Sequence, residues 1–169
     1  MLSIILFEQN LFPAADFDIE ETTVDKIDPK EFELLVKMQT AMNKLMGTYD
    51  EFTKELNKIR SARQQFESWK NKKALIFILR KKENRSIAGY CIVVNAFVKN
   101  VCHVSELYLD KKYRSGGLGK MFLTKVENIM KSKGYNAIRL FCLKNNEAGN
   151  GLYNSLGYGV TSSVYSKKL

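Results

Sequence analysis

The stretch from Glu106 to Lys120 constrains this chain more than any other part of its 169 residues. An alternating apolar run, Val101–Leu109, predicts a β-strand, and the apolar spacing over Gly117–Lys133 predicts a helix. The junction Arg114–Lys120 holds three glycines, which permit a tight turn and the close approach of a ligand. The free N–H groups of the first helical turn then lie beside this loop. The sequence therefore predicts an α/β protein with a pyrophosphate site at the loop.

The remaining elements alternate between helices and strands. Asp28-Pro29-Lys30-Glu31 has the composition of a helix start, and Gly47 is expected to end that helix. A second helix is expected to follow from Thr48 to Trp69, with an apolar stripe that packs in the core. Further predicted elements are strands at 17–24, 74–79, 87–98, 137–143 and 160–166, and a short helix at 146–156. We expect one domain over residues 1–169, in which 1–16 could form an extra strand or an arm.

Composition excludes several classes of protein. Apolar residues make up 45% of the chain and charged residues 27%, as is usual for a soluble globular protein. Apolar runs such as Ile4–Phe7 and Ala74–Leu79 are too short for a membrane span or a signal peptide. Three cysteines without CxxC spacing and a single histidine, His103, argue against a disulfide framework and a histidine-rich metal site. A cytoplasmic protein without a metal is expected.

The charge of the chain is +9 and is unevenly distributed. Residues 1–36 hold nine acidic and two basic side chains, whereas the rest of the chain is basic. A basic body attracts polyanions such as nucleic acid or a phosphorylated cofactor. No strand shows aromatic residues interleaved with Lys and Arg, the usual pattern of a nucleic-acid surface. Nucleic acid is therefore the less favoured partner.

A second motif follows the predicted strand at 137–143. It reads Asn146-x-x-Gly149-x-x-Leu152-Tyr153 and closes with Leu156-Gly157-Tyr158. Together with Arg114-x-x-Gly117-x-Gly119, it resembles the two sequence motifs of the GNAT superfamily, the Gcn5-related N-acetyltransferases. One helix and one strand separate the motifs, as in that family. The resemblance is strong over residues 87–160 and rests on element order alone over 17–86.

The resemblance implies a particular fold and cofactor. The fold is a mixed, mostly antiparallel central sheet of six to seven strands, with helices on both faces and splayed parallel strands in the middle. The co-substrate is acetyl-CoA, without a metal. The residues implied to bind it are Leu107, Tyr108, Leu109, Arg114, Ser115, Gly116, Gly117, Leu118, Gly119, Lys120, Asn146 and Tyr153.

The resemblance also implies direct transfer of an acetyl group to a primary amine of a small molecule, in a ternary complex. Tyr153 would protonate the leaving thiolate, and Glu106 would take the proton of the amine. Each residue has a plainer interpretation. Tyr153 lies on one helical side with Leu152 and Leu156 and could be a buried aromatic. Glu106 could face solvent, unless a strand irregularity changes the face on which it lies.

Several departures from the family pattern bear on the loop and the acceptor. Ser115 and Gly116 stand where the family often has a glycine and a basic residue, so Lys112 or Lys120 could supply the missing charge. Gly149 replaces the usual alanine, which weakens that helix but opens room. The strand at 137–143 lacks the glutamate that peptide N-terminal acetylators of the family often carry there. This counts against a peptide α-amine as acceptor.

The acceptor itself has no clear signature in residues 28–70. The acidic N-terminal stretch, which includes Glu31 and Glu33, could attract a cationic amine or could merely balance charge. The alternative functions are a protein or peptide N-acetyltransferase, a basic nucleic-acid-binding domain without enzymatic activity, and a domain that binds CoA without chemistry. A homodimer is possible.

Overall fold

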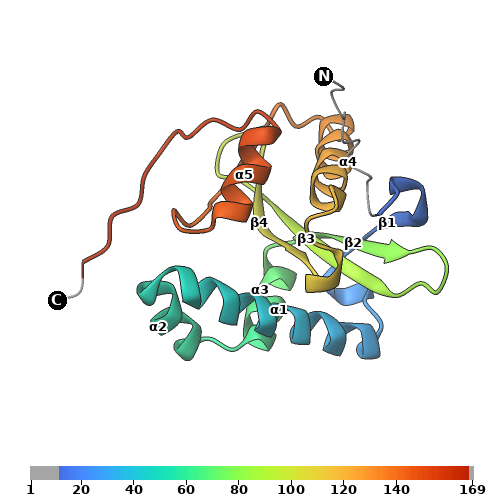
Figure 1. The fold of residues 1–169 in the computed structure, drawn as a ribbon, viewed down its shortest axis with the longest axis horizontal. Coiled ribbons are helices and arrows are strands. Elements are labelled where there is room, and N and C mark those ends of the chain that lie inside the picture. The colour runs from blue at the N-terminus through green and yellow to red at the C-terminus, as the bar shows by residue number, and fades with distance from the viewer. Residues whose placement is uncertain (1–11, 168–169) are drawn as a thin grey trace, which may run out of the picture.

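The computed structural model describes residues 12–167, which form a five-stranded sheet with helices on both faces (Figure 1). The strands lie in chain order, and all neighbours are antiparallel except the last two. They are β1 (Phe17–Thr22), β2 (Leu75–Lys81), β3 (Ile87–Asn95), β4 (Val101–Leu109) and β5 (Ala137–Leu140). Within residues 12–167, no helix combines the length and apolar character needed to cross a membrane.

Helices cover both faces of the sheet (Figure 1). The first face carries α1 (Pro29–Tyr49) and α3 (Ala62–Asn71), with α2 (Glu51–Ile59) packed against α1, and the second carries α4 (Leu118–Ser132) and α5 (Glu147–Ser155). Each face has its own hydrophobic core. Phe66 and Trp69 of α3 pack with Tyr90 on the first face, and Phe122 of α4 packs with Phe77 on the second. The predicted α/β class and the helices on both faces are confirmed.

The number of strands is lower than predicted. The sheet has five strands rather than six to seven, because the segment at 160–166 is extended but unpaired. Three polar residues in a row interrupt its apolar positions, so it has little apolar surface to bury, and Val160, Val164 and Tyr165 are exposed. The parallel pair β4–β5 consequently lies at the edge of the sheet, not in its middle.

The predicted extra strand or arm over 1–16 falls mostly on residues 1–11, outside the described residues. Of the remainder, Ala14–Asp16 form a short 3-10 turn instead of a strand.

The helices of the first face also differ from the prediction. Gly47 does not end α1, which continues to Tyr49 and is followed by α2 after the cap Asp50. A Cβ at Gly47 would lie 3.3 Å from Cβ of Lys54, so the glycine permits the close approach of α2. The predicted helix from Thr48 to Trp69 is broken before Ser61, whose side chain and that of Gln64 form a capping box.

A β-bulge in β4 separates two parts of the sheet. Ile92 of β3 pairs with Glu106, and the next residue, Val93, pairs with Val104, so Ser105 has no opposite residue. On the other side of β4, pairing with β5 ends at Val104 and Leu140. The remaining residues of β4 therefore have no neighbouring strand on that side within the described sheet.

Candidate active site

The glycine loop forms the start of α4 as the sequence predicts. Gly117 is the N-cap residue in a left-handed conformation with φ of 76°, and no side chain caps the helix. The first backbone bond of the helix runs from Met121 N to Gly117 O at 3.1 Å. The N–H groups of Leu118, Gly119 and Lys120 thus have no partner within the helix. This end of α4 offers an anion several N–H donors and the positive end of the helix dipole.

Ser115 in the same loop also has a positive φ, 63°. Only glycine adopts this conformation without strain, so the backbone accounts for the glycine often found here in the family that the sequence resembles. Gly116 is buried, and a Cβ at Gly119 would be in van der Waals contact with Leu109 Cδ1, at 3.4 Å.

The basic side chains near the loop are bound by other groups of the protein. Arg114 Nε donates to Leu109 O at 2.9 Å, and its guanidinium lies 5.2 Å from the centre of the Tyr108 ring. Lys120 Nζ donates to Ser155 O at 3.2 Å, at the end of α5. Lys112 lies over the Tyr113 ring. These contacts brace the loop, and they leave backbone N–H groups as its main donors toward a phosphate.

The end of β4 presents unpaired backbone groups beside the loop. Asp110 N donates to Ala88 O, and Tyr108 is the partner of Tyr90 in the same register. In an antiparallel ladder, alternate residues bond to one neighbour, so the backbone groups of Leu107 and Leu109 point away from β3. They point to the side on which β5 has ended. Leu109 O accepts from Arg114, and the two N–H groups remain available to an amide carbonyl.

Glu106 lies on the face of the sheet covered by α1 and α3. Glu106 shares this face with Tyr108 by ordinary alternation, and the bulge at Ser105 places Val104 on the opposite face instead of the same one. Burial raises the pKa of the Glu106 carboxyl to about 8, while an interaction with the Gln39 amide lowers it. The carboxyl therefore exchanges its proton near neutral pH, as a general base requires.

Tyr153 lies on the opposite face, where α5 packs against the sheet. Its ring is 5.7 Å from that of Tyr158, whose hydroxyl donates to Glu127 Oε1 at 2.6 Å. Burial, first of all, raises the pKa of the Tyr153 phenol, and the charge of Glu106 contributes in the same direction. The phenol keeps its proton at neutral pH, so it can serve as an acid. Glu106 and Tyr153 thus lie on opposite faces of the sheet.

Asn146 and Gly149 have a structural role at the start of α5. Asn146 Oδ1 accepts from Gly149 N at 3.0 Å and caps the helix. A Cβ at Gly149 would lie 2.6 Å from Asn146 Nδ2 and 3.0 Å from Cys142 Sγ. The room that Gly149 was expected to open is therefore filled by Asn146 and Cys142, and the Asn146 side chain is engaged within the protein.

Sequence reasoning missed a polar cluster on the Glu106 face. Gln39, Asn43 and Gln65 connect α1 to α3, and Tyr90 joins them from β3. The available signal was Gln39 itself, a polar residue one turn from Leu35 and Met42 on the apolar side of the predicted helix.

The acidic N-terminal stretch is engaged in ion pairs. Glu31 binds the buried Arg80, which also binds Glu20, and Glu33 binds Arg63. Further pairs join Asp25 to Lys70 and Glu21 to Lys133. This arrangement favours the charge-balancing interpretation over attraction of a cationic acceptor.

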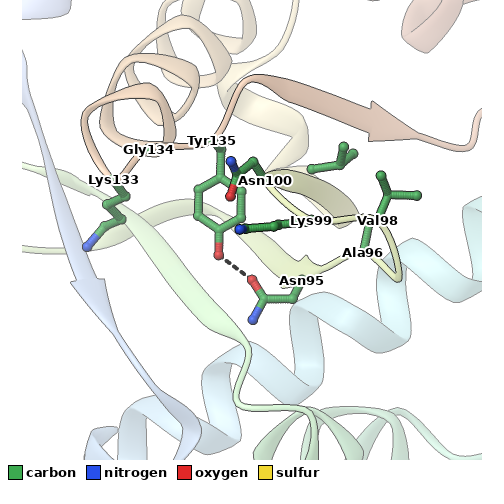
Figure 2. A pocket seen from close by; sticks show the side chains of 9 residues that line it. Asn95, Ala96, Val98, Lys99, Asn100, Lys133, Gly134 and Tyr135 are labelled. Carbon is green, nitrogen blue, oxygen red and sulfur yellow. Dashed lines mark hydrogen bonds between the residues drawn. The ribbon is translucent and has the colours of Figure 1, made fainter.

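A cavity of about 310 Å³ lies at the opposite end of β4 from the glycine loop. Figure 2 shows its lining of residues from the β3–β4 hairpin and from the end of α4, with Lys99 and Lys133 near the hydrogen-bonded pair Tyr135 and Asn95. It belongs to neither motif. Among residues 12–167, no cluster of three His, Cys, Asp or Glu side chains is placed to hold a metal ion.

The two motifs and Glu106 fall inside a stretch of the chain that matches a known family, and Tyr153 is part of the second motif. Residues 41–158 match the model of the acetyltransferase (GNAT) family. The chain belongs to this family. As a GNAT acetyltransferase, it uses acetyl-CoA as the acetyl donor. The resemblance seen in the sequence is thereby confirmed.

Solved structures of acetyltransferases share the fold at low sequence identity. The putative acetyltransferase YycN from Bacillus subtilis is 20% identical, with a TM-score of 0.67 over 90% of this chain and 99% of its own. The PaiA N-acetyltransferase from Thermoplasma acidophilum, solved with coenzyme A, is 18% identical, with a TM-score of 0.68 over 88% and 92%.

An aminoglycoside acetyltransferase from an uncultured soil metagenomic sample is 15% identical, with a TM-score of 0.63 over 92% of this chain and 99% of its own. The chain matches no curated protein.

Proposed function

We propose that this GNAT acetyltransferase transfers the acetyl group of acetyl-CoA to a primary amine of a small molecule, by direct attack in a ternary complex. The observation that carries the proposal is the unpaired end of β4, with Glu106 on one face and Tyr153 on the other. An amine that approaches from the Glu106 face and a thiolate that leaves toward Tyr153 need no movement of either side chain across the sheet.

The chain binds the donor through backbone groups. The free N–H groups at the start of α4 hold the pyrophosphate, and those of Leu107 and Leu109 bond to the amide groups of the pantetheine arm. A backbone N–H near Leu109 stabilises the thioester oxygen as it becomes negative during attack. Arg114 supports this arrangement by holding the Leu109 carbonyl and the Tyr108 ring.

Glu106 and Tyr153 perform the two proton transfers. The acceptor amine is an ammonium ion in water at neutral pH, with a pKa of about 10.4 for a lysine-like amine. Glu106 takes its proton, directly or through water, and the free amine attacks the carbonyl. Tyr153 gives its proton to the sulfur that leaves. The C–N bond forms as the C–S bond breaks, and no covalent enzyme intermediate is needed.

Two observations favour a small molecule as the acceptor. β5 carries no acidic residue, so the acidic group expected of a peptide N-terminal acetylator is missing from it. The aminoglycoside acetyltransferase that shares the fold was solved with sisomicin, a small molecule with several amines. These features favour polyamine-like or aminoglycoside-like acceptors over peptides.

A thiol-release assay with acetyl-CoA tests the proposal. The panel of acceptors contains polyamines, aminoglycosides, amino acids and lysine peptides, and Glu106→Gln is the control for base-dependent release. We expect release with a small amine, lost in the Glu106→Gln variant. Release with lysine peptides alone would favour the protein acetyltransferase. CoA binding without release for any amine would contradict catalysis, and a salt-dependent shift of DNA together with no CoA binding would favour the nucleic-acid-binding domain.

A further inference from the structure

The helix α2 carries three large apolar side chains that do not enter the core. Phe52, Leu56 and Ile59 belong to the stripe that the sequence predicts to pack in the core, but they are 50%, 51% and 80% exposed. Phe66 and Trp69 of α3, which continue the same predicted stripe, are buried on the first face of the sheet. The exposure is therefore a property of α2 and not of the whole segment.

The apolar stripe lies on the side of α2 that faces away from α1. On the other side, Asn57 Nδ2 donates to Asn43 O at 2.9 Å, and Lys54 Cβ would lie 3.3 Å from a Cβ at Gly47. All three apolar side chains lie about 100–160° around the helix axis from Asn57 and Lys54. In Figure 1, α2 is at the lower left of the view, beside the end of α1. The stripe is therefore open to a partner.

The spacing of these side chains is typical of a helix–helix contact. Apolar residues scattered singly over a surface are common, whereas positions i, i+4 and i+7 form one continuous stripe. An antiparallel second copy of α2 offers a matching stripe. About a twofold axis, Phe52 of one copy lies opposite Ile59 of the other, and the two Leu56 side chains meet.

The charges of α2 favour the same arrangement. Glu51 at the start of the helix and Lys58 near its end lie on the same flank of the stripe, about 20° apart around the axis. A twofold axis brings this flank of both helices together in antiparallel order. Lys58 of each copy then lies beside Glu51 of the other. A parallel pair would make neither contact.

The ion pairs within α2 leave room for such contacts. Lys58 Nζ lies 2.7 Å from Glu55 Oε1, and an ammonium group has two further hydrogens to donate. Glu51 Oε2 lies 3.5 Å from Lys54 Nζ, in an exposed pair. With two acidic and two basic residues, Glu51–Ile59 has no net charge, whereas helices that bind anionic membranes are rich in Lys and Arg. A second copy therefore fits this helix better than a lipid surface does.

We propose that α2 is a self-association surface: two copies of this chain pair through Phe52, Leu56 and Ile59 of antiparallel α2 helices, with Glu51 of each beside Lys58 of the other. Nine residues give a contact about 13 Å long, which places it among the small interfaces. We expect a dimer with a dissociation constant of about 10–100 µM. This inference is independent of the proposed acetyl transfer, because α2 holds none of the residues assigned to it.

Sedimentation equilibrium of the full chain, without acetyl-CoA, measures the dissociation constant. The concentrations should bracket the expected value, from about 1 to about 500 µM. Leu56→Glu places two carboxylates together at the twofold axis and should raise the dissociation constant at least about 100-fold. Leu34→Glu, on a leucine of α1 that is 48% exposed, is the matched control and should leave it unchanged.

A charge exchange tests the antiparallel order. Lys58→Glu and Glu51→Lys each bring like charges together at both ends of the contact, so each should raise the dissociation constant about ten-fold. In an equal mixture of these two variants, every acidic residue again faces a basic one. The mixture should therefore form a mixed dimer with nearly the affinity of the unaltered chain.

A monomer at every concentration would overturn the inference, and so would a dimer that Leu56→Glu leaves unchanged. Equal affinity of the mixed dimer and the two variant homodimers would overturn the antiparallel pairing. Circular dichroism checks that each variant folds; if Leu56→Glu does not, the charge exchange still decides, since both of its changes are on exposed side chains. Binding of a monomeric chain to uncharged lipid vesicles, lost in Leu56→Glu, would assign the stripe to a membrane surface instead.

Discussion

Glu106 and Tyr153 are ionisable residues on opposite faces of one strand, and burial shifts both toward their protonated forms. For the carboxyl, the shift brings the pKa to about 8, where it can alternate between acid and base. For the phenol, it keeps a proton in place until a thiolate needs it. One physical cause, burial, thus suits Glu106 to the proposed role of base and Tyr153 to the proposed role of acid, because the two groups begin from different ordinary pKa values.

The first prediction concerns Tyr153. Tyr153→Phe keeps the ring and its packing against Tyr158 but removes the proton. Turnover should fall by about 100-fold or more, the usual contribution of a general acid, and affinity for acetyl-CoA should change little. Steady-state kinetics and calorimetry with acetyl-CoA measure the two effects. Near-normal turnover would assign Tyr153 to packing alone.

The second prediction concerns the pH dependence set by Glu106. Activity should rise as the pH increases through about 8, because the base must be ionised. Stability should change in the opposite direction. The pKa is higher in the folded state than the unfolded value of about 4.3, so the stabilisation is complete below that value and is lost as the pH rises through 8.

Thermal unfolding from pH 5 to pH 9 measures this loss. In Glu106→Gln, most of the decrease in thermal stability between pH 5 and pH 9 that is due to the carboxyl should disappear. Glu33→Gln, a change of an exposed side chain, should leave that decrease unchanged. Equal curves for Glu106→Gln and the unaltered protein would show that the carboxyl is not buried enough to matter.

At the level of elements, the start of α4 is the proposed site for the pyrophosphate of the cofactor. A side chain at Gly119 projects toward Leu109 and Leu152, into the space beside the free N–H groups. Gly119→Glu adds bulk and a negative charge there, and CoA affinity should fall to an undetectable level while the fold persists. Gly119→Ala, whose methyl group has ordinary contacts of 3.4 and 3.7 Å, is the matched control and should retain binding.

Calorimetry with CoA and circular dichroism separate the two outcomes. Binding by Gly119→Glu at normal affinity would exclude the loop as the pyrophosphate site.

The same elements show how far the sequence could predict the structure. The strand, loop and helix around Gly117 were predictable because hydrophobic period and glycine act locally there. Gly47 misled because its role is tertiary: it permits contact with Lys54 rather than ending a helix. The break before Ser61 was readable, since Ser61 and Gln64 have capping-box spacing.

The site was predictable only in part, for the same reason. Glu106 and Tyr153 could be chosen by motif, but the face of Glu106 depends on Ser105 having no partner in β3, which alternation cannot reveal. The position of the Gln39 side chain depends on hydrogen-bond partners that lie far away in the sequence, Gln65 and Tyr90. The strand expected at 160–166 needed a neighbour that the described sheet does not provide.

At the scale of the whole molecule, ion pairs join the acidic N-terminal part to the basic remainder. Arg80 is only 4% exposed and bonds to both oxygens of Glu31, at 2.7 and 2.9 Å, so it ties β2 to α1. Glu33 of α1 and Arg63 of α3 form an exposed pair. The pair with the buried Arg80 should contribute more to the free energy of unfolding, because water screens the charges of the exposed pair.

Glu31→Gln should therefore lower the free energy of unfolding by about 1.5–3 kcal/mol, and Glu33→Gln by less than about 1 kcal/mol. Denaturant unfolding measures both. Neither change should alter KM for the acceptor. A raised KM in the variant that combines Glu31→Gln with Glu33→Gln, measured where that variant is still folded, would indicate that the acidic stretch attracts the substrate.

Because of the bulge at Ser105, the proposed cofactor site depends on the number of residues in β4. The extra residue bends and twists β4 at the point where its pairing with β5 stops. Deletion of Ser105 leaves Val104 and Glu106 on their present faces but removes the bend, so β4 and β5 can continue side by side. We expect a folded protein, by circular dichroism, that no longer binds CoA by calorimetry; retained affinity would refute this. The space for acetyl-CoA then depends on the number of residues in β4. Removal of one residue would close that space without altering any side chain proposed to contact the cofactor.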